Sequence, residues 1–198
     1  MLDALFGRSK NALIQQMGSS DNKQVLKAVE LLKAKGWFRD GSLHAAQLEK
    51  ANLRGAALAR AEMQRANLRG ANLTKAYLGE TQLKAAILAE AVLHEANMRS
   101  VVLTEADLSG ADLSRAYLAL AHLTGTNFQN ATLHGTNFWQ ADLSGANLEG
   151  AAMRDVVFFE TRFNEQTVLP DGSRWTTTTE WARFTDPNHA AFWLGDSR

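Results

Sequence analysis

Residues 51–75 read ANLRG, AALAR, AEMQR, ANLRG and ANLTK, five consecutive units of five residues that share one pattern. The first residue of each unit is Ala, the second is often Asn, and the third is Leu or Met. The same spacing extends from Leu43 to Val168, over 26 positions with no insertion. All 26 are apolar: 18 Leu, 3 Met, 4 Phe and 1 Val. Such regularity predicts a repeat architecture.

The five-residue period distinguishes helical from extended structure. In an α-helix a step of five residues turns about 500°, so successive Leu would drift by about 140° and form no apolar stripe. In an extended segment, residues two apart point to the same side, so the Ala and the Leu of a unit both face inward. Short straight sides separated by corners predict a coil. Gly recurs at the expected corners, two residues after the inward residue: Gly55, Gly70, Gly110, Gly125, Gly135, Gly145 and Gly150.

The Ala-(Asp/Asn)-Leu-X-X pattern, as in Ala51-Asn52-Leu53 and Ala106-Asp107-Leu108, resembles the pentapeptide-repeat family over residues 41–169. The resemblance implies an all-β solenoid: a right-handed quadrilateral β-helix with four pentads per turn and about six and a half coils. Inward Leu or Phe would fill the axis, with Ala against the wall. With about 4.8 Å between stacked strands, the rod would be roughly 30 Å long.

Non-repeat segments flank the repeat, so we expect three parts: a helical cap over residues 1–40, the β-helix over 41–169, and an aromatic-rich, short helical or irregular tail over 170–198. Residues 21–35 are predicted to form a capping helix, with Asp21 as N-cap and Gly36 as the stop. This layout is similar to that of a bacterial subgroup of the family. A second amphipathic helix is expected ahead of it, packed on the rod or, alternatively, attached to a membrane surface: Leu2, Leu5, Phe6, Leu13, Ile14 and Met17.

Positions four pentads apart should stack on one face, because four pentads make up each coil. One face is predicted to present outward apolar side chains: Tyr77, Tyr117, Leu120, Trp139, Val157 and Phe159. The tail supplies further candidates for an interface: Trp175, Trp181, Phe184 and Trp193. Contiguous exposed aromatics are typical of interaction surfaces. Three occupants of this face remain open: the tail itself, a second copy of the chain, or a foreign protein. A homodimer through the tail is a further alternative.

The chain has 21 basic residues, 21 acidic residues and no Cys. The absence of Cys excludes disulfides and thiolate metal sites, and it fits a cytoplasmic location. No apolar run reaches about 18 residues and the N-terminus lacks a secretory-signal pattern, so no membrane span is expected. The balanced total argues against a nucleic-acid partner. The charge is uneven, however: residues 41–100 carry +3 and residues 101–170 carry −5.

The expected function is a non-enzymatic protein–protein interaction scaffold. The resemblance implies an alternative, because some members of the family imitate the shape and charge of DNA, bind DNA gyrase and confer quinolone or toxin resistance. Duplex DNA carries about one negative charge per 1.7 Å, whereas residues 41–170 carry a net charge of −2. This difference argues against the gyrase role. A peripheral membrane scaffold, attached through residues 1–17, is the third possibility.

No catalytic, cofactor-binding or metal-ligating residues are predicted. The sequence lacks a phosphate-binding loop, a dinucleotide fingerprint and a His-Glu-x-x-His motif. His94 and His134 should share one face but lie two coils apart, about 10 Å, which is too far for one metal ion. Asp107 and Asp112 occupy the middle position of the unit, where a short polar side chain can bond turn backbone groups. A convex rod filled with Leu offers no cleft of the kind that holds an active site.

Overall fold

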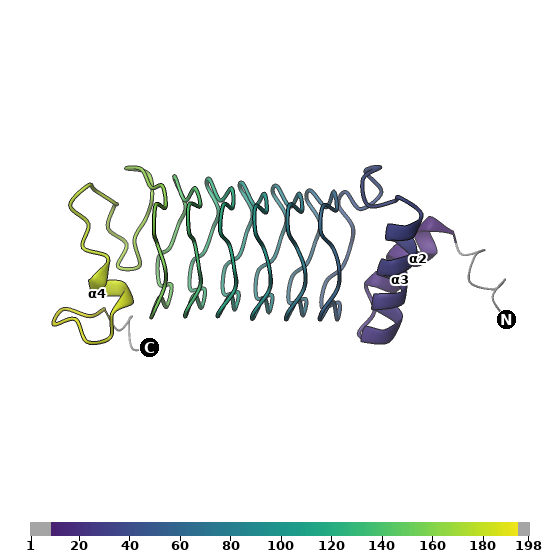
Figure 1. Ribbon diagram of the computed structural model, residues 1–198, viewed down its shortest axis with the longest axis horizontal. Coiled ribbons are helices and arrows are strands. Elements are labelled where there is room, and N and C mark those ends of the chain that lie inside the picture. The colour runs from purple at the N-terminus through teal and green to yellow at the C-terminus, as the bar shows by residue number, and fades with distance from the viewer. Residues whose placement is uncertain (1–8, 194–198) are drawn as a thin grey trace.

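The computed structural model describes residues 9–193, in which a stack of coils has two helices at one end and the tail at the other (Figure 1). Helices α2 (Lys10–Met17) and α3 (Asn22–Ala34) precede the coils, and the short helix α4 (Ala182–Thr185) lies in the tail. None of these helices is long and apolar enough to cross a membrane.

Single-residue parallel bridges join each coil to the next. Nearly all of them connect residues that are four pentads apart in the sequence, as Asn67 and Ile87 are. The bridged residues form four columns, and each column defines one face of the rod. We name these faces A, B, C and D after the columns that contain Asn67, Asn72, Tyr77 and Gln82, respectively. Four faces to every coil make the quadrilateral β-helix that the family resemblance implies.

Backbone hydrogen bonds hold both the stack and its corners. Between coils, the Leu68 N–H donates to the Ile87 oxygen at 2.7 Å, and the Ile87 N–H donates to the Ala66 oxygen at 2.9 Å. Within a coil, the Ala71 N–H donates to the Leu68 oxygen at 3.0 Å and closes a turn. The second central residue of such a turn has positive φ. The seven predicted corner glycines have φ between 61° and 71°, which confirms them as corners.

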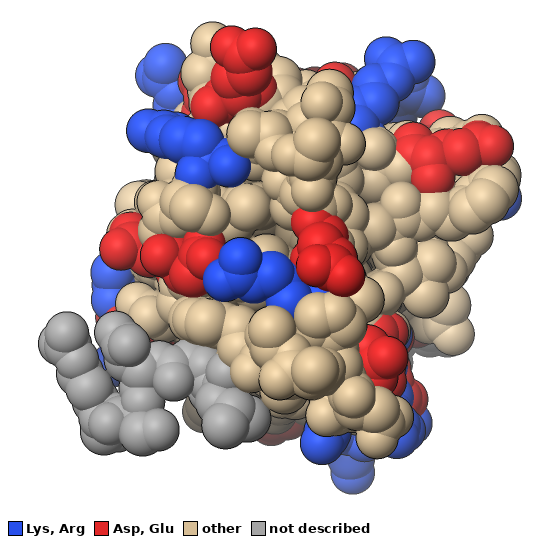
Figure 2. Space-filling view, turned by 90° about the vertical axis from the view of Figure 1, so that its left-hand side faces the viewer, with Lys and Arg blue, Asp and Glu red and all other residues tan. Residues whose placement is uncertain are grey.

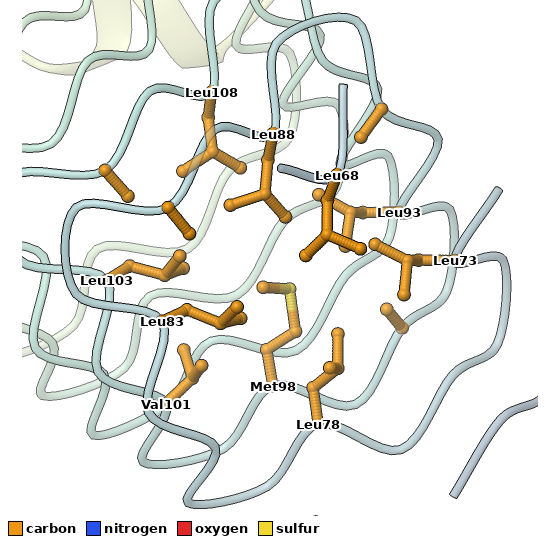
Figure 3. Packing of buried hydrophobic residues seen from close by; sticks show 14 of the residues in the cluster. Leu68, Leu73, Leu78, Leu83, Leu88, Leu93, Met98, Val101, Leu103 and Leu108 are labelled. Carbon is orange, nitrogen blue, oxygen red and sulfur yellow. The ribbon is translucent and has the colours of Figure 1, made fainter. Parts of the chain in front are cut away.

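Inward side chains fill the axis of the rod. The inward residues from Leu43 to Leu148 are all fully buried, and Figure 3 shows Leu68, Leu88 and Leu108 stacked from successive coils. Where Thr replaces the inward Ala, its hydroxyl donates to a carbonyl oxygen of the preceding coil. An example is the 2.9 Å bond from Thr136 to the Leu113 oxygen. The core therefore accepts Thr because each buried hydroxyl finds a partner.

The period breaks once, in the last coil. The regular spacing would pair Asn147 with Thr167, but Asn147 bridges to Val168 instead, so one extra residue lies between Arg162 and Val168. Val168 therefore occupies the outward bridging position, and the buried Leu169 takes the inward one. The prediction of uninterrupted inward positions up to Val168 is wrong at this last position. The Thr167 hydroxyl, 3.1 Å from the Leu143 oxygen, fixes the shifted register.

Helix α3 confirms the helix predicted over residues 21–35. The Asp21 side chain accepts hydrogen bonds from two backbone N–H groups of the first turn, as an N-cap does. The residues that the helix buries recur at three- and four-residue intervals, which is why one face packs against the core: Val25, Ala28, Val29 and Leu32. The chain leaves the helix through Gly36, with φ of 72°.

Helix α2 packs beside α3 and buries Leu13 and Met17. Lys10, its first residue, lies 2.6 Å from the Asp40 carboxylate and 5.1 Å from the centre of the Trp37 ring. These contacts tie α2 to the segment that enters the first coil. Of the predicted second amphipathic helix, the first part lies outside the described residues: Leu2, Leu5 and Phe6.

Candidate functional site

Face C carries most of the exposed large apolar side chains among the described residues. Its bridged column contains Tyr77, Tyr117 and Val157, with exposed fractions of 58%, 36% and 42%. The remaining members of this column are Ala57, Asn97 and Asn137. All six project outward because they lie between two inward residues, and the bridges set them one coil apart.

A second column runs along face C, one residue after each inward residue. Its members are Ala59, Gly79, Arg99, Ala119, Trp139 and Phe159. Phe159 is 61% exposed, the highest value among the exposed large apolar residues, while Trp139 is partly buried. The Trp139 N–H donates to the Asn137 side-chain oxygen at 2.8 Å, which holds the turn that carries the indole. Leu120 follows at the adjoining corner, partly buried, with φ of 61°.

The apolar residues of the tail lie elsewhere, at the end of the rod. Trp181 packs on Phe158 and Phe163, with ring centroids 4.5 Å and 4.6 Å apart. Phe184 is fully buried beside Trp181, and Trp193 packs edge-on against Phe184. Trp175 stacks on Phe163 at 6.1 Å.

The predicted interface residues therefore form two groups. Tyr77, Tyr117, Leu120, Trp139 and Phe159 share face C and its corner, whereas the four tail residues pack together over the last coil. The tail covers the end of the core and leaves Tyr77 and Phe159 open to solvent. Phe184 has no surface to offer a partner in this arrangement.

Charged residues line the edge between faces C and D. Arg60 and Glu80 form an ion pair of 3.0 Å across adjacent coils, and Gln140 donates to the Glu160 carboxylate. The hydrogen bond from Arg60 lowers the pKa of Glu80 below its ordinary value. Beside this edge lies a shallow, open depression of about 720 Å³ lined by polar residues, including Arg60, Glu80 and His122.

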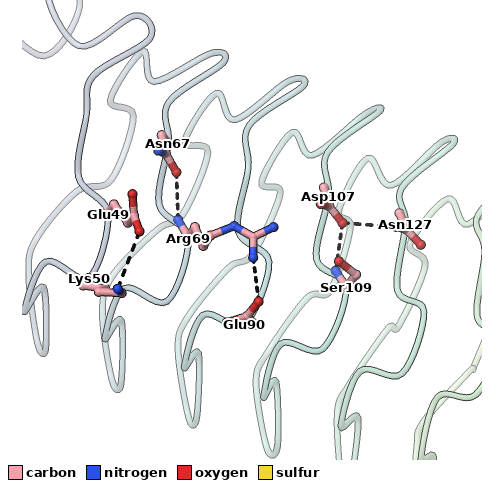
Figure 4. A network of polar contacts seen from close by, with 8 residues as sticks. All are labelled: Glu49, Lys50, Asn67, Arg69, Glu90, Asp107, Ser109 and Asn127. Carbon is pink, nitrogen blue, oxygen red and sulfur yellow. Dashed lines mark hydrogen bonds and ion pairs between the residues drawn. The ribbon is translucent and has the colours of Figure 1, made fainter.

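Face A differs from face C because polar side chains cover it (Figure 4). Asp107 accepts from the Ser109 N–H at 3.0 Å and from the Asn127 amide at 3.1 Å. Arg69 pairs with Glu90 at 2.6 Å. The Asp107 contacts confirm that the middle Asp of a unit bonds its own turn, and Asp112 makes the same bond to the Ser114 N–H. Ile87, 41% exposed, is an isolated apolar residue on this face.

No grouping within residues 9–193 brings together three His, Asp or Glu side chains that could hold a metal ion. His94 contacts Glu95 at 3.1 Å, and His134 instead accepts a hydrogen bond from the Arg154 N–H through Nδ1. Burial lowers the pKa of His134, and the charge of Arg154 lowers it further.

The sequence-based set missed the small residues of face C. Ala57, Ala59 and Gly79 lie in the same two columns as the aromatic residues but towards the N-terminal end. The four-pentad spacing alone would have placed them there. Exposed aromatic residues mark a binding surface in a sequence, whereas the small residues beside them carry no such signal.

Comparison with solved structures gives partial matches. Rfr23, a pentapeptide-repeat protein from the cyanobacterium Cyanothece 51142, is 35% identical over 44% of this chain and 63% of its own, with a TM-score of 0.40. HetL from Nostoc sp. strain PCC 7120, involved in heterocyst differentiation regulation, is 29% identical over 67% of this chain and 76% of its own, with a TM-score of 0.39. The aligned region thus spans less than two thirds of Rfr23.

Full-length QnrB1, a plasmid-mediated fluoroquinolone resistance protein, is 15% identical over 60% of this chain and 76% of its own, with a TM-score of 0.31. Comparison with curated proteins gives no match.

The profile described as pentapeptide repeats matches eight copies within residues 42–79, 76–115 and 121–158. These ranges cover more than half of the chain, and they coincide with the coils that the parallel bridges join. The solved members of the family form right-handed quadrilateral β-helices, the fold implied by the Ala-(Asp/Asn)-Leu unit. The chain belongs to the family of pentapeptide-repeat proteins.

Proposed function

We propose that this protein is a non-enzymatic interaction scaffold that binds protein through face C. The observation that supports this proposal most directly is the apolar surface formed by Tyr77, Tyr117, Val157 and Phe159 on one side of a rigid rod. Exposed apolar residues gathered on one face are typical of protein interaction sites. The other faces present mainly polar side chains, so one side of the rod is distinguished for binding.

The fold favours binding over catalysis. The axis is filled by fully buried Leu, Met and Phe side chains, so reactive groups can only project from the convex surface. Two surface depressions are open and are lined by side chains that serve cross-coil contacts, such as Arg60 with Glu80 and Gln140 with Glu160. A flat side with regularly spaced residues suits the recognition of another protein surface.

The charge arrangement does not favour the alternative gyrase-binding role. Several acidic residues are paired with a basic residue of the preceding coil: Arg60–Glu80, Arg69–Glu90, Lys75–Glu95 and Lys84–Glu105. At the end covered by the tail, acidic and basic side chains are interspersed (Figure 2). Imitation of DNA requires an uncompensated row of negative charge. We therefore expect no protection of DNA gyrase from a fluoroquinolone in a supercoiling assay.

The proposal is tested by affinity capture from the native host followed by mass spectrometry. The bait is the full chain, and the test variant combines Tyr77→Ser with Phe159→Ser, since both side chains are exposed and neither supports the core. Ile87→Ser on face A is the matched control. Partners retained by the wild type and the control but lost by the test variant would support face C. Equal retention by all three proteins would refute it.

We further propose that the rod has about six and a half coils and that α2 and α3 act as its N-terminal cap. The bridges from Gln47 to Val168 support this coil number, and the buried residues of both helices, including Leu13 and Leu32, belong to the same apolar cluster as the coils. Removal of residues 1–40 should expose Leu43 and Leu48 and cause aggregation, as measured by light scattering. A soluble, folded truncation would contradict the capping role.

A further inference from the structure

We propose that the partner of face C is a second copy of this chain, packed face to face with the two rods antiparallel. The inference rests on the proposed function and specifies its partner. A two-fold axis that lies in the interface, perpendicular to the rods and midway along face C, would set the first coil of one copy against the last coil of the other. Because each column contains one residue per coil, the facing pairs follow directly from the bridge register.

The second column of face C is complementary in size to itself when reversed. In the antiparallel arrangement Phe159 faces Ala59 of the other copy, and Trp139 faces Gly79. The third pair sets the exposed Arg99 against Ala119, whose side chain is fully buried in the single chain. Each pair therefore joins one large side chain to one small one. The exposed Phe159 ring would have only methyl groups opposite it in the second copy. Packing of large against small residues allows two flat surfaces to interdigitate.

The bridged column behaves in the same way. Val157 faces Ala57 of the second copy, Tyr77 faces Asn137, and Tyr117 faces Asn97. No pair sets two aromatic rings directly against each other or leaves two small residues facing across a gap. The two tyrosines each meet an amide side chain that can bond the phenol hydroxyl.

Charges at both edges of the face are also complementary. At the edge towards face D, the exposed Arg60 meets the exposed Glu160 of the second copy. At the edge towards face B, Arg115 meets Glu95. No like charges face each other at the corner positions of either edge. Opposite charges at the rim of an apolar patch fix its orientation and register.

Other arrangements of the same face lose this complementarity. A parallel pair would set Val157 against Phe159 at one end and Ala57 against Ala59 at the other, and it would bring Glu160 to Asp155. A shift of the antiparallel pair by one coil towards the C-terminus would oppose Glu80 and Glu160. The reverse shift would oppose Lys75 and Arg115. Like charges that face each other cost affinity, so only the unshifted antiparallel register satisfies both edges.

The size of the face predicts a modest affinity. Six coils at about 4.8 Å and a side of five residues at about 3.3 Å give a strip of about 30 by 16 Å. Two copies would together bury about 1,000 Å², the lower end of the range for specific interfaces. We therefore expect a dimer that dissociates on dilution.

The first test measures the mass of the purified full chain by sedimentation between about 1 and 200 µM, the range in which an interface of this size should dissociate. Phe159→Ser should raise the dissociation constant at least about tenfold, whereas Ile87→Ser on face A should leave it unchanged. Arg60→Glu and Glu160→Arg should each weaken association, and their combination should restore it. A monomer at every concentration, or variants without effect, would overturn the proposal.

The second test determines the orientation. The chain contains no Cys, so single Cys substitutions can be linked selectively by a bis-maleimide with a spacer of about 10 Å, close to the separation of packed sheets. A mixture of Ala57→Cys and Val157→Cys proteins should give a covalent dimer of the two. Ala57→Cys alone should give none, because its two copies would lie about 24 Å apart. Linkage of Ala57→Cys to itself would show a parallel pair and overturn the proposed arrangement.

Failure of this inference is distinguishable from failure of the proposed function. A purified chain that stays monomeric but loses a host partner on Tyr77→Ser with Phe159→Ser would overturn self-association and support a foreign protein on face C. If that variant kept both the dimer and the host partner, the self-association and the proposed function of face C would both be refuted.

Discussion

Single inward residues of this rod have effects that can be separated from those of their outward neighbours. Leu113 is fully buried at the middle of the stack, and Ser114, the next residue, projects from the surface. Leu113→Ala should therefore lower the free energy of unfolding by about 2–5 kcal/mol, because it removes buried methyl groups and leaves a cavity. Ser114→Ala should change it little, since the bond to Asp112 uses the Ser114 backbone N–H. Equal losses in denaturant titrations would show that the inward register is wrong.

Substitutions at the corner residues test the backbone conformation of the turns, not the packing of the core. Gly110 has φ of 66°, and a Cβ added there would meet only the Glu90 side chain at 3.8 Å. Gly110→Ala should therefore destabilise by about 1 kcal/mol through the left-handed conformation alone. Gly79 does not have positive φ, and its Cβ would lie 3.7 Å from the nearest backbone oxygen. Gly79→Ala should stabilise by about 0.5 kcal/mol, because it restricts the unfolded chain. Changes of the same sign in thermal unfolding would contradict this reasoning.

At the scale of elements, the attachment of α2 should depend on pH. The hydrogen bond from Lys10 lowers the pKa of Asp40 to about 2. A carboxyl with a depressed folded-state pKa stabilises the fold above its ordinary pKa of about 3.9, and this contribution is lost as the pH falls through about 2. Asp40→Asn and Lys10→Gln should both flatten the fall in melting temperature between pH 4 and pH 2. An unchanged pH profile in both variants would exclude this ion pair as a contributor.

The elements differ in how far the sequence predicts them. Local sequence patterns predict both the coils and α3. The coils follow from the five-residue period, and α3 follows from its N-cap, its apolar face and Gly36. The extra residue before Thr167 is not evident from the sequence, because Val168 and Leu169 are both apolar and either can complete the period. The available signal is Gln166, which stands in a position otherwise held by small residues. Thr167-Val168-Leu169 fits the unit better than Gln166-Thr167-Val168 does.

The tail could not be placed from its sequence. Trp181 and Phe184 follow no period, and their positions depend on the end of the core, where Phe158 and Phe163 offer ring surfaces to pack against. An aromatic-rich composition predicts that such a segment packs on something. The partner surface exists only once the coils have formed, so the placement of Trp181 is a tertiary property.

At the scale of the whole molecule, the bridge register makes a prediction about deletions. Removal of residues 101–120, one full turn, should bring positions 97 and 137 onto adjacent coils about 4.8 Å apart. Asn97→Cys with Asn137→Cys should then form an intramolecular disulfide on mild oxidation, because this separation lies within the range of disulfide geometry. The same pair in the full-length chain, two coils apart, should not. Mass spectrometry after oxidation distinguishes the two results.

Removal of residues 101–105 alone provides the contrasting variant. The core should survive, because every unit contributes an equivalent inward residue, but position 137 should move to the neighbouring face. No disulfide to position 97 is then expected. A disulfide in this variant would mean that the coils do not stack in register.

Apart from the single extra residue in the last coil, the units are equivalent to one another. This equivalence means that folding and the binding face place different constraints on insertions and deletions in the gene. Duplication or loss of any whole number of pentads keeps Leu in the axis and so preserves folding. Only changes in multiples of four pentads keep Tyr77 and Phe159 on a common side. Length differences among relatives of this protein thus become informative: steps of four pentads indicate selection on a binding face, and other whole numbers of pentads indicate selection on folding alone.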